Sequence, residues 1–341
     1  MMCSKTDVPV ALVFFNRPEQ FRKVFKTVQR ARPSRLFLIQ DGPRQGNEND
    51  AVNVEKCRQI VEDIDWECEV TTDYSEENLG CGKRIYTGLS KCFEYVDRLI
   101  ILEDDCVPSP SFFPFCEELL EKYKNDERVG MITGMNHLNT FDKADGDYIF
   151  SEVGSIAGWA TWRRSWSNVK FQLNETVEDE EAVRLLKNMG KYSVNRGFMI
   201  KTAIKKNEEQ KAGKKLSSWS TQFSLEQLLN SRLVIAPKVN LMSNIGLTAE
   251  SANSASSIKM VPRGLRPLYR LKLYEMEFPL KHPKHLVNDV EYGERVNKMM
   301  HPNKAVSLMR KVESVFLRVI HGDMKSIIKS LKRRMKCIFK R

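Results

Sequence analysis

The sequence contains no apolar run of the length that a membrane-spanning helix needs, about 18–20 residues. The first apolar run, Val8–Phe15, is short and includes Pro9. It is predicted to be a buried strand, and a secretory signal is not expected. These absences predict a cytoplasmic protein.

Cysteine and histidine do not occur in metal-finger patterns. The chain has eight cysteines without a C-x-x-C pair, and no histidine lies at zinc-finger distance from them. Free thiols are therefore expected. The nucleotide-binding patterns G-x-x-x-x-G-K-[ST] and G-x-G-x-x-G are also missing, which argues against simple ATPases and dinucleotide-binding enzymes.

Basic residues are concentrated at the C-terminus. The net charge is +11, and residues 304–341 hold twelve Lys or Arg and only two acids, so the rest of the chain is nearly neutral. Nucleic acid is therefore not expected as a partner of the folded part. Apolar residues recur at helical spacing in this tail and cations fill much of the other face, which predicts a helix on an anionic membrane surface. A packed terminal helix pair and an RNA-binding tail are the alternatives.

Apolar runs alternate with helical patterns through the first hundred residues. Strands separated by helices favour βαβ units and a parallel sheet, so we expect an α/β fold: a Rossmann-like mixed sheet with helices on both faces. The predicted strands are Val8–Phe14, Leu36–Ile39, Glu67–Thr71, Leu99–Leu102, Val129–Thr133, Tyr148–Glu152 and Leu233–Ala236. The predicted helices include 18–33, 51–64, 112–124, 177–190, 199–211 and 219–230, and we assign no chemistry to 177–190 or 199–211.

Three adjacent carboxylates follow the fourth strand. Alternation places Glu103 and Asp105 on one side and Asp104 on the other. Such carboxylates repel one another unless a cation lies between them, and a hard divalent ion with oxygen ligands would also bridge to phosphate oxygens. The alternative is a solvated turn that caps the next helix.

A loop of small residues, Asn78–Arg84, opens the third helix. Backbone amides at a helix start, together with Lys83 and Arg84, suit a diphosphate, and the alternative is a loop with solvated cations. Asn16-Arg17 and Asp41 follow the first two strands. In parallel sheets such strand ends meet at the edge where ligands bind.

Several motifs together resemble those of GT-A-fold glycosyltransferases, near the family-2-like and N-acetylglucosaminyltransferase-I-like groups. The resemblance covers roughly residues 8–250. It is carried by Val13-Phe14-Phe15-Asn16-Arg17-Pro18, Gln40-Asp41-Gly42, Asn78-Leu79-Gly80, the segment Leu102–Pro110, Ala157-Gly158-Trp159-Ala160-Thr161-Trp162 and Asn244-Ile245-Gly246.

The resemblance implies a role for each motif. Asp105 would hold Mn²⁺ or Mg²⁺ on the donor diphosphate, and Glu103 and Asp104 would face the ribose and the transferred sugar. The remaining nucleotide-sugar contacts would come from Phe14, Asn16, Arg17, Asp41, Asn78, Gly80, Lys83 and Arg84, with Trp159 lining the sugar and acceptor pocket. Plain core packing is the alternative for Trp159.

Two departures from the family pattern concern catalysis. Related sequences often carry an acid, a candidate general base, where this chain has Ser220, and a histidine shortly after the Asn-Ile-Gly motif, where Leu247–Ser254 has none. Glu226, seven residues beyond Trp219 and on roughly the same helical face, is a candidate base. A solvated helix acid is the alternative.

The resulting hypothesis is an inverting, metal-dependent glycosyltransferase. It would transfer sugar from a nucleotide-diphosphate donor, most simply a UDP-sugar, to a glycan or lipid-linked acceptor from the inner face of a membrane. A sugar nucleotidyltransferase and a non-catalytic nucleotide-sugar-binding module are the alternatives. Residues 1–250 form the predicted enzyme domain, with a nucleotide-binding half (1–110) and an acceptor half (111–250), followed by an irregular extension (251–303) and the basic helical tail (304–341).

Overall fold

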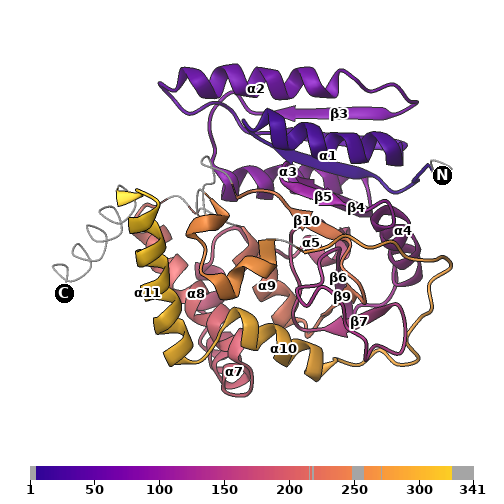
Figure 1. Cartoon of the computed structure of the whole chain (residues 1–341). Helices are drawn as coiled ribbons and strands as arrows, with labels where there is room; N and C mark the ends of the chain where they lie inside the picture. The colour runs from indigo at the N-terminus through magenta and orange to yellow at the C-terminus, as the bar shows by residue number, and fades with distance from the viewer. Residues whose placement is uncertain (1–4, 215, 217–218, 248–256, 270, 325–341) are drawn as a thin grey trace.

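A mixed eight-stranded sheet forms the centre of the molecule (Figure 1). The computed structural model describes residues 5–214, 216, 219–247, 257–269 and 271–324. The strand order is β3-β2-β1-β4-β8-β6-β9-β7. The first four strands in sequence are parallel to one another: β1 (Val10–Phe14), β2 (Arg35–Gln40), β3 (Glu69–Tyr74) and β4 (Arg98–Glu103).

The second half of the sheet is mixed in direction. β8 (Trp159–Trp162) runs antiparallel between β4 and β6 (Val129–Thr133), while β9 (Leu233–Pro237) is parallel to β6 and β7 (Tyr148–Ser151) is antiparallel to β9. β1, β2, β4, β6 and β9 therefore all end at one edge of the sheet. We call this the carboxyl edge, and the opposite one the amino edge.

Helices cover both faces because the central strands are apolar on both sides. In β1, Val10, Leu12 and Phe14 belong to one core, and Ala11 and Val13 belong to the other. The first core is closed by α1 (Pro18–Ala31), α2 (Glu48–Val61) and α4 (Phe112–Lys122), and the second by α3 (Cys81–Tyr95), α5 (Arg163–Trp166) and α9 (Ser220–Leu229). The predicted fold class is confirmed.

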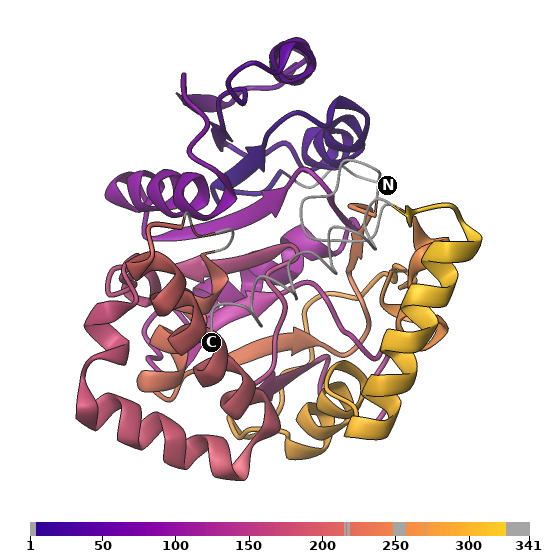
Figure 2. The same cartoon turned by 90° about the vertical axis from the view of Figure 1, so that its left-hand side faces the viewer.

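Further helices pack around the second half of the sheet (Figure 2). α8 packs on α9 through Ile200, Ala203 and Leu225, and α10 packs on the β7 side through Tyr292 and Val296. These helices are α6 (Asn174–Val177), α7 (Glu180–Tyr192), α8 (Val194–Lys211), α10 (Val290–Met300) and α11 (Lys304–Ile320), with 3-10 turns at Ile258–Met260 and Arg263–Tyr269. The extension predicted to be irregular thus contains α10, and the part of the predicted tail from residue 325 onward lies outside the described residues.

A small second sheet was not anticipated from the sequence. β5 (Cys106–Pro108) pairs antiparallel with β10 (Met242–Asn244) immediately after the three carboxylates. This pairing brings Asn244 and Gly246 from the far end of the domain to Asp105.

Neither a disulfide nor a membrane span is found in the described part of the chain. The six cysteines that it contains are free, as predicted, and Cys3 and Cys337 lie outside it. Within the same residues, every helix is too short or too polar to traverse a bilayer.

Candidate functional site

The acidic triplet meets Arg17 at the carboxyl edge. The Arg17 guanidinium bonds both carboxylate oxygens of Asp104, and its Nη1 lies 3.1 Å from Asp105 Oδ2. The Phe15 backbone N–H also donates to Asp104 Oδ2 at 3.3 Å. Two strand ends far apart in sequence are therefore joined, as the sequence predicted.

The triplet holds more negative charge than Arg17 neutralises. Burial, with the charges of Asp105 and Asp104, raises the pKa of Glu103 to about 8. Burial also raises the pKa of Asp104 to about 6, although Arg17 opposes this. Because each raised pKa reports a cost of ionisation, a cation bound here would be stabilised.

Asp105 is more accessible to a cation from solution than Asp104. Its side chain is 16% exposed, against 4% for Asp104. Asn244 Nδ2 donates to Asp105 Oδ1 at 3.2 Å, and the Ile245 N–H donates to the Asp105 carbonyl at 2.8 Å. A Cβ at position 246 would stand 2.1 Å from Asp105 Oδ2, so Gly246 is required for this close approach.

The protein side chains here could supply only part of the coordination shell of a metal ion, and phosphate oxygens could supply the rest. In the described residues, no three His, Cys, Asp or Glu side chains are placed to enclose a metal ion by themselves. Mg²⁺ and similar ions are commonly held by one or two carboxylates together with substrate phosphates and water. A single, partly accessible carboxylate at Asp105 fits that arrangement, whereas a closed protein cage does not.

Asp41 organises a loop, which corrects its predicted role as a nucleoside ligand. Its Oδ1 accepts from the Gly42 and Leu79 N–H groups at 3.1 and 2.8 Å, and its Oδ2 accepts from Gly80 N–H and Asn78 Nδ2 at 2.9 and 3.1 Å. With two donors on each oxygen, the carboxylate has no acceptor capacity left for a base. Gly80 precedes α3 at a φ of 79°, a conformation that favours glycine.

Phe15, not Phe14, is the aromatic ring at the carboxyl edge. Phe14 is buried and stacks on Phe21, with ring centroids 4.2 Å apart. Phe15 is half-buried, and the Arg44 guanidinium lies over its ring at 5.7 Å. The prediction for Phe14 was wrong because adjacent strand residues face opposite sides of the sheet.

Asn16 is linked through Asp50 to Arg44, the residue that lies over the Phe15 ring. Its Nδ2 donates to Asp50 Oδ1 at 2.7 Å, and Asp50 in turn binds Arg44 through two bonds of 2.5 and 2.7 Å. Asn16 thus positions Arg44 through Asp50. Direct contact of Asn16 with a nucleotide stays a prediction.

The two cations of the α3 start have different surroundings. Arg84 is buried; its guanidinium bonds the Asp73 carboxylate and, at 3.1 Å, the Gln40 carbonyl. It fastens α3 to the sheet and is not free to bind phosphate, which corrects the prediction. Lys83 is exposed in the first turn, and its predicted contact with the nucleotide is untested.

Trp159 is a core residue. It is completely buried in β8 and packs on Trp219 and Phe223 with centroids 5.3 and 5.0 Å apart. The prediction that it lines the sugar pocket was therefore wrong, and the alternative of core packing is correct.

Glu226 lies at the amino edge, away from the carboxylates. Its side chain faces Arg232 Nη1 at 3.7 Å, and Arg232 also pairs with Glu127 at 2.8 Å, just before β6 begins. α9 starts beside Trp159 at the carboxyl edge, and seven residues of helix carry the chain about 10 Å away from it. Glu226 is thus not placed to act as the catalytic base.

Lys206 is a site residue that the sequence did not reveal. It lies on α8, in a stretch to which we assigned no chemistry, and its Nζ donates to Thr221 Oγ1 at 2.7 Å at the start of α9. Burial lowers the pKa of Lys206, and Cys81 is one of the groups that act on it. Burial and then the charges of Glu103, Asp104 and Asp41 raise the pKa of Cys81 to about 12, so Cys81 lies in the field of the acidic site, and Lys206 is linked to that site through Cys81.

No protein-family model matches the sequence, and no curated protein matches it. Solved structures with partial similarity include a mannosyltransferase from Pyrobaculum calidifontis in complex with GDP-Man and Mn²⁺, at TM-score 0.33 and 11% identity over 48% of this chain and 46% of that one. The inositol-1-phosphate CTP transferase of T. maritima gives 0.35 and 10% over 78% and 96%. Mouse xyloside xylosyltransferase 1 gives 0.32 and 12% over 67% and 84%. Likenesses this distant establish no activity.

Proposed function

We propose that this protein is a GT-A-type glycosyltransferase that takes a sugar from a nucleotide-diphosphate donor, most simply a UDP-sugar, with the help of Mn²⁺ or Mg²⁺. The observation that carries the proposal is the reachable Asp105 carboxylate within an acidic cluster at the carboxyl edge. Rossmann-like sheets bind their ligands at this edge. The acceptor would be a glycan or a lipid-linked glycan.

The surroundings of Asp105 support a nucleotide diphosphate as the ligand. On one side, the Phe15 ring and the Arg44 guanidinium offer flat surfaces for a base. On the other side, Lys206 and the exposed Lys83 provide positive charge for phosphate oxygens. The Asp41-bound loop fixes the start of α3.

A metal ion held by Asp105 would neutralise charge on the departing diphosphate. The protein side chains would bind and orient the donor around it. Glu226, at the amino edge, is not placed to deprotonate the acceptor.

Donor hydrolysis tests this proposal. We expect release of UDP from at least one member of a panel of UDP-sugars in the presence of Mn²⁺, and none after addition of EDTA. Liquid chromatography of the nucleotide products measures this release. Binding of UDP without release from any donor would reject the enzyme in favour of a binding module.

The two alternatives, a sugar nucleotidyltransferase and a non-catalytic binding module, predict different structural features. A sugar nucleotidyltransferase should have a Gly-rich loop after the first strand, whereas only Phe15, Asn16 and Arg17 separate β1 from α1 and Arg17 is tied to two carboxylates. The remote position of Glu226 and the presence of Ser220 favour a non-catalytic module. The hydrolysis experiment separates the module from the transferase, and formation of UTP from a UDP-sugar and pyrophosphate would identify a nucleotidyltransferase.

Lys206 gives a prediction about the phosphate end of the donor. Lys206→Met keeps the aliphatic stem and removes the ammonium group, so we expect UDP affinity to fall about tenfold, the equivalent of about 1.4 kcal/mol. Uridine affinity should not change, because uridine lacks the diphosphate. Calorimetric titration with each ligand measures both effects. The exposed neighbour Lys205, changed to Met, is the control, and an equal loss for UDP and uridine would contradict the assignment.

We further propose that α11 holds the protein on an anionic membrane surface. Its packed side is marked by the buried Leu317, and the opposite side is apolar and exposed. The exposed residues, each at least 51% accessible, are Leu308, Met309, Val312, Val315, Phe316, Val319 and Ile320. Lys304, Lys311 and Arg318 follow one another every seven residues along the border of this apolar side. An apolar stripe bordered by cations is typical of helices that lie in the membrane interface.

Vesicle flotation provides the test. The full-length protein should float with phosphatidylglycerol-containing vesicles, and the variant L308E/V312E/V315E should lose most of this binding because it introduces acids on the exposed apolar side. The control V52E/L185E/V287E makes the same charge change at exposed apolar residues outside α11. Equal flotation of the α11 variant and the wild type would contradict the proposal.

A further inference from the structure

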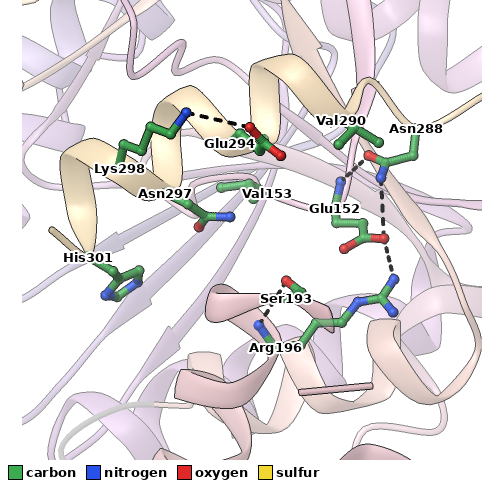
Figure 3. A pocket seen from close by; sticks show the side chains of 11 residues that line it. Glu152, Val153, Ser193, Arg196, Asn288, Val290, Glu294, Asn297, Lys298 and His301 are labelled. Carbon is green, nitrogen blue, oxygen red and sulfur yellow. Dashed lines mark hydrogen bonds and ion pairs between the residues drawn. The ribbon is translucent and has the colours of Figure 1, made fainter. Parts of the chain in front are cut away.

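A polar cleft of about 490 Å³ lies between α8 and α10, apart from the carboxylate cluster. Figure 3 shows Ser193 and Arg196 on one wall and Asn297 and Lys298 on the other. Glu152 leaves β7 between the walls, and because β7 is antiparallel to β9 it does so at the amino edge of the sheet. The volume is within the range of small-molecule sites, about 300–1,000 Å³.

The charges of the cleft are balanced. Arg196 pairs with Glu152, and Lys298 Nζ lies 3.5 Å from Glu294 Oε2. A site for a nucleotide or phosphate would be expected to contain more basic than acidic side chains. The cleft instead combines paired charges with the Asn297 amide, which can donate to and accept from neutral hydroxyl groups, while the Asn288 amide bonds Glu152 and the Ser193 hydroxyl caps α8.

An aromatic surface borders these polar groups. The His301 ring lies in the cleft wall and is 4.5 Å, centroid to centroid, from the ring of Phe198 on α8. Phe198 is 52% exposed. Burial lowers the pKa of His301, which favours the uncharged imidazole. An aromatic face beside hydroxyl-binding groups suits a pyranose, which has an apolar C–H face and a polar rim.

We propose that this cleft binds a neutral saccharide unit of the acceptor, away from the hydroxyl that receives the transferred sugar. The inference rests on the proposed function. α8 connects the two edges of the sheet: Arg196 lines the cleft, and Lys206, ten residues later, bonds Thr221 at the start of α9 on the carboxyl-edge side, a rise of about 15 Å. An oligosaccharide of a few units spans this separation, so only an extended acceptor occupies both.

Saturation-transfer NMR on the full-length protein tests the inference with cellotetraose, chitotetraose, maltotetraose and mannotetraose as probes. At least one should receive saturation, and N297A and F198A should each weaken its binding at least fivefold. Both side chains are at least partly accessible, and unchanged UDP affinity in each variant verifies that the fold is intact. The control is N53A, the same substitution at a half-buried helical position on the distant α2.

The outcomes separate this inference from the proposed function. Absence of transfer to all four probes, or transfer that both variants leave unchanged, overturns the saccharide site. UDP titration in the same samples reports on the donor site alone. Loss of an oligosaccharide signal with normal UDP binding therefore rejects only the cleft, and oligosaccharide binding without UDP binding rejects the donor assignment.

Discussion

Asp105→Asn is expected to remove metal-dependent UDP binding. The amide keeps the shape of the side chain and can still accept from Asn244, but it lacks the charge that attracts a divalent ion. UDP affinity measured calorimetrically with Mn²⁺ should fall about a hundredfold or more, which corresponds to about 2.8 kcal/mol. In EDTA, the variant and the wild type should bind UDP equally weakly.

The control for this prediction is Asp145→Asn, which makes the same change at an exposed position outside the cluster. It should retain the full response to Mn²⁺. If Asp105→Asn also retains that response, the cation is held elsewhere and the proposed role of Asp105 is rejected.

The fold was predictable because its signals are local and repeated. β1, β2 and β4 are apolar runs that helices cover on both faces, and the polar residues that follow them meet at one edge. The meeting of Arg17 with Asp104 and Asp105 follows from that topology. The periodicity of each segment was sufficient to place these strand ends at one edge, but the ion pairs of Arg17 were not predicted, and its predicted contact with the nucleotide stays untested.

The errors concern properties that no single segment determines. Phe14 and Phe15 are both aromatic at a strand end, and only the register of β1 against the helices decides which one is buried. Trp159 lies in β8, a strand of four residues. Its burial depends on the pairing of β8 with β4 and β6, which the local sequence does not indicate. Glu226 lies on the expected face of α9, but it is about two turns further along the helix than Trp219 and therefore lies at the amino edge of the sheet.

Lys206 illustrates the opposite case, a site residue with no sequence signal. Several lysines occur along α8, and nothing in their spacing distinguishes one from another. The packing of α8 on α9 selects Lys206 by placing its ammonium at Thr221. Long-range packing of this kind is visible only in the folded structure.

Arg17→Met should destabilise the protein by roughly 3 kcal/mol at pH 8, the scale of removing one partner from a buried ion pair. Asp104, whose side chain is 4% exposed, would lose its cation, and the repulsion within the triplet would have no counter-charge from Arg17. Urea unfolding followed by tryptophan fluorescence measures the change. The control is Arg128→Met: Arg128 pairs with Asp126 at the surface, so its loss should leave stability almost unchanged.

The loss in Arg17→Met should depend on pH and on metal. Burial and neighbouring charges already raise the pKa of Asp104 to about 6 and that of Glu103 to about 8, and removal of Arg17 raises them further. A carboxyl group with a higher pKa when folded binds more protons in the folded state, so stability falls as pH rises through the interval between the unfolded and folded values. The destabilisation relative to wild type should thus be smaller at pH 5.5 than at pH 8, and Mn²⁺ should restore part of it at pH 8. A loss that is equal at both pH values and insensitive to Mn²⁺ would show that Arg17 contributes packing and not charge compensation.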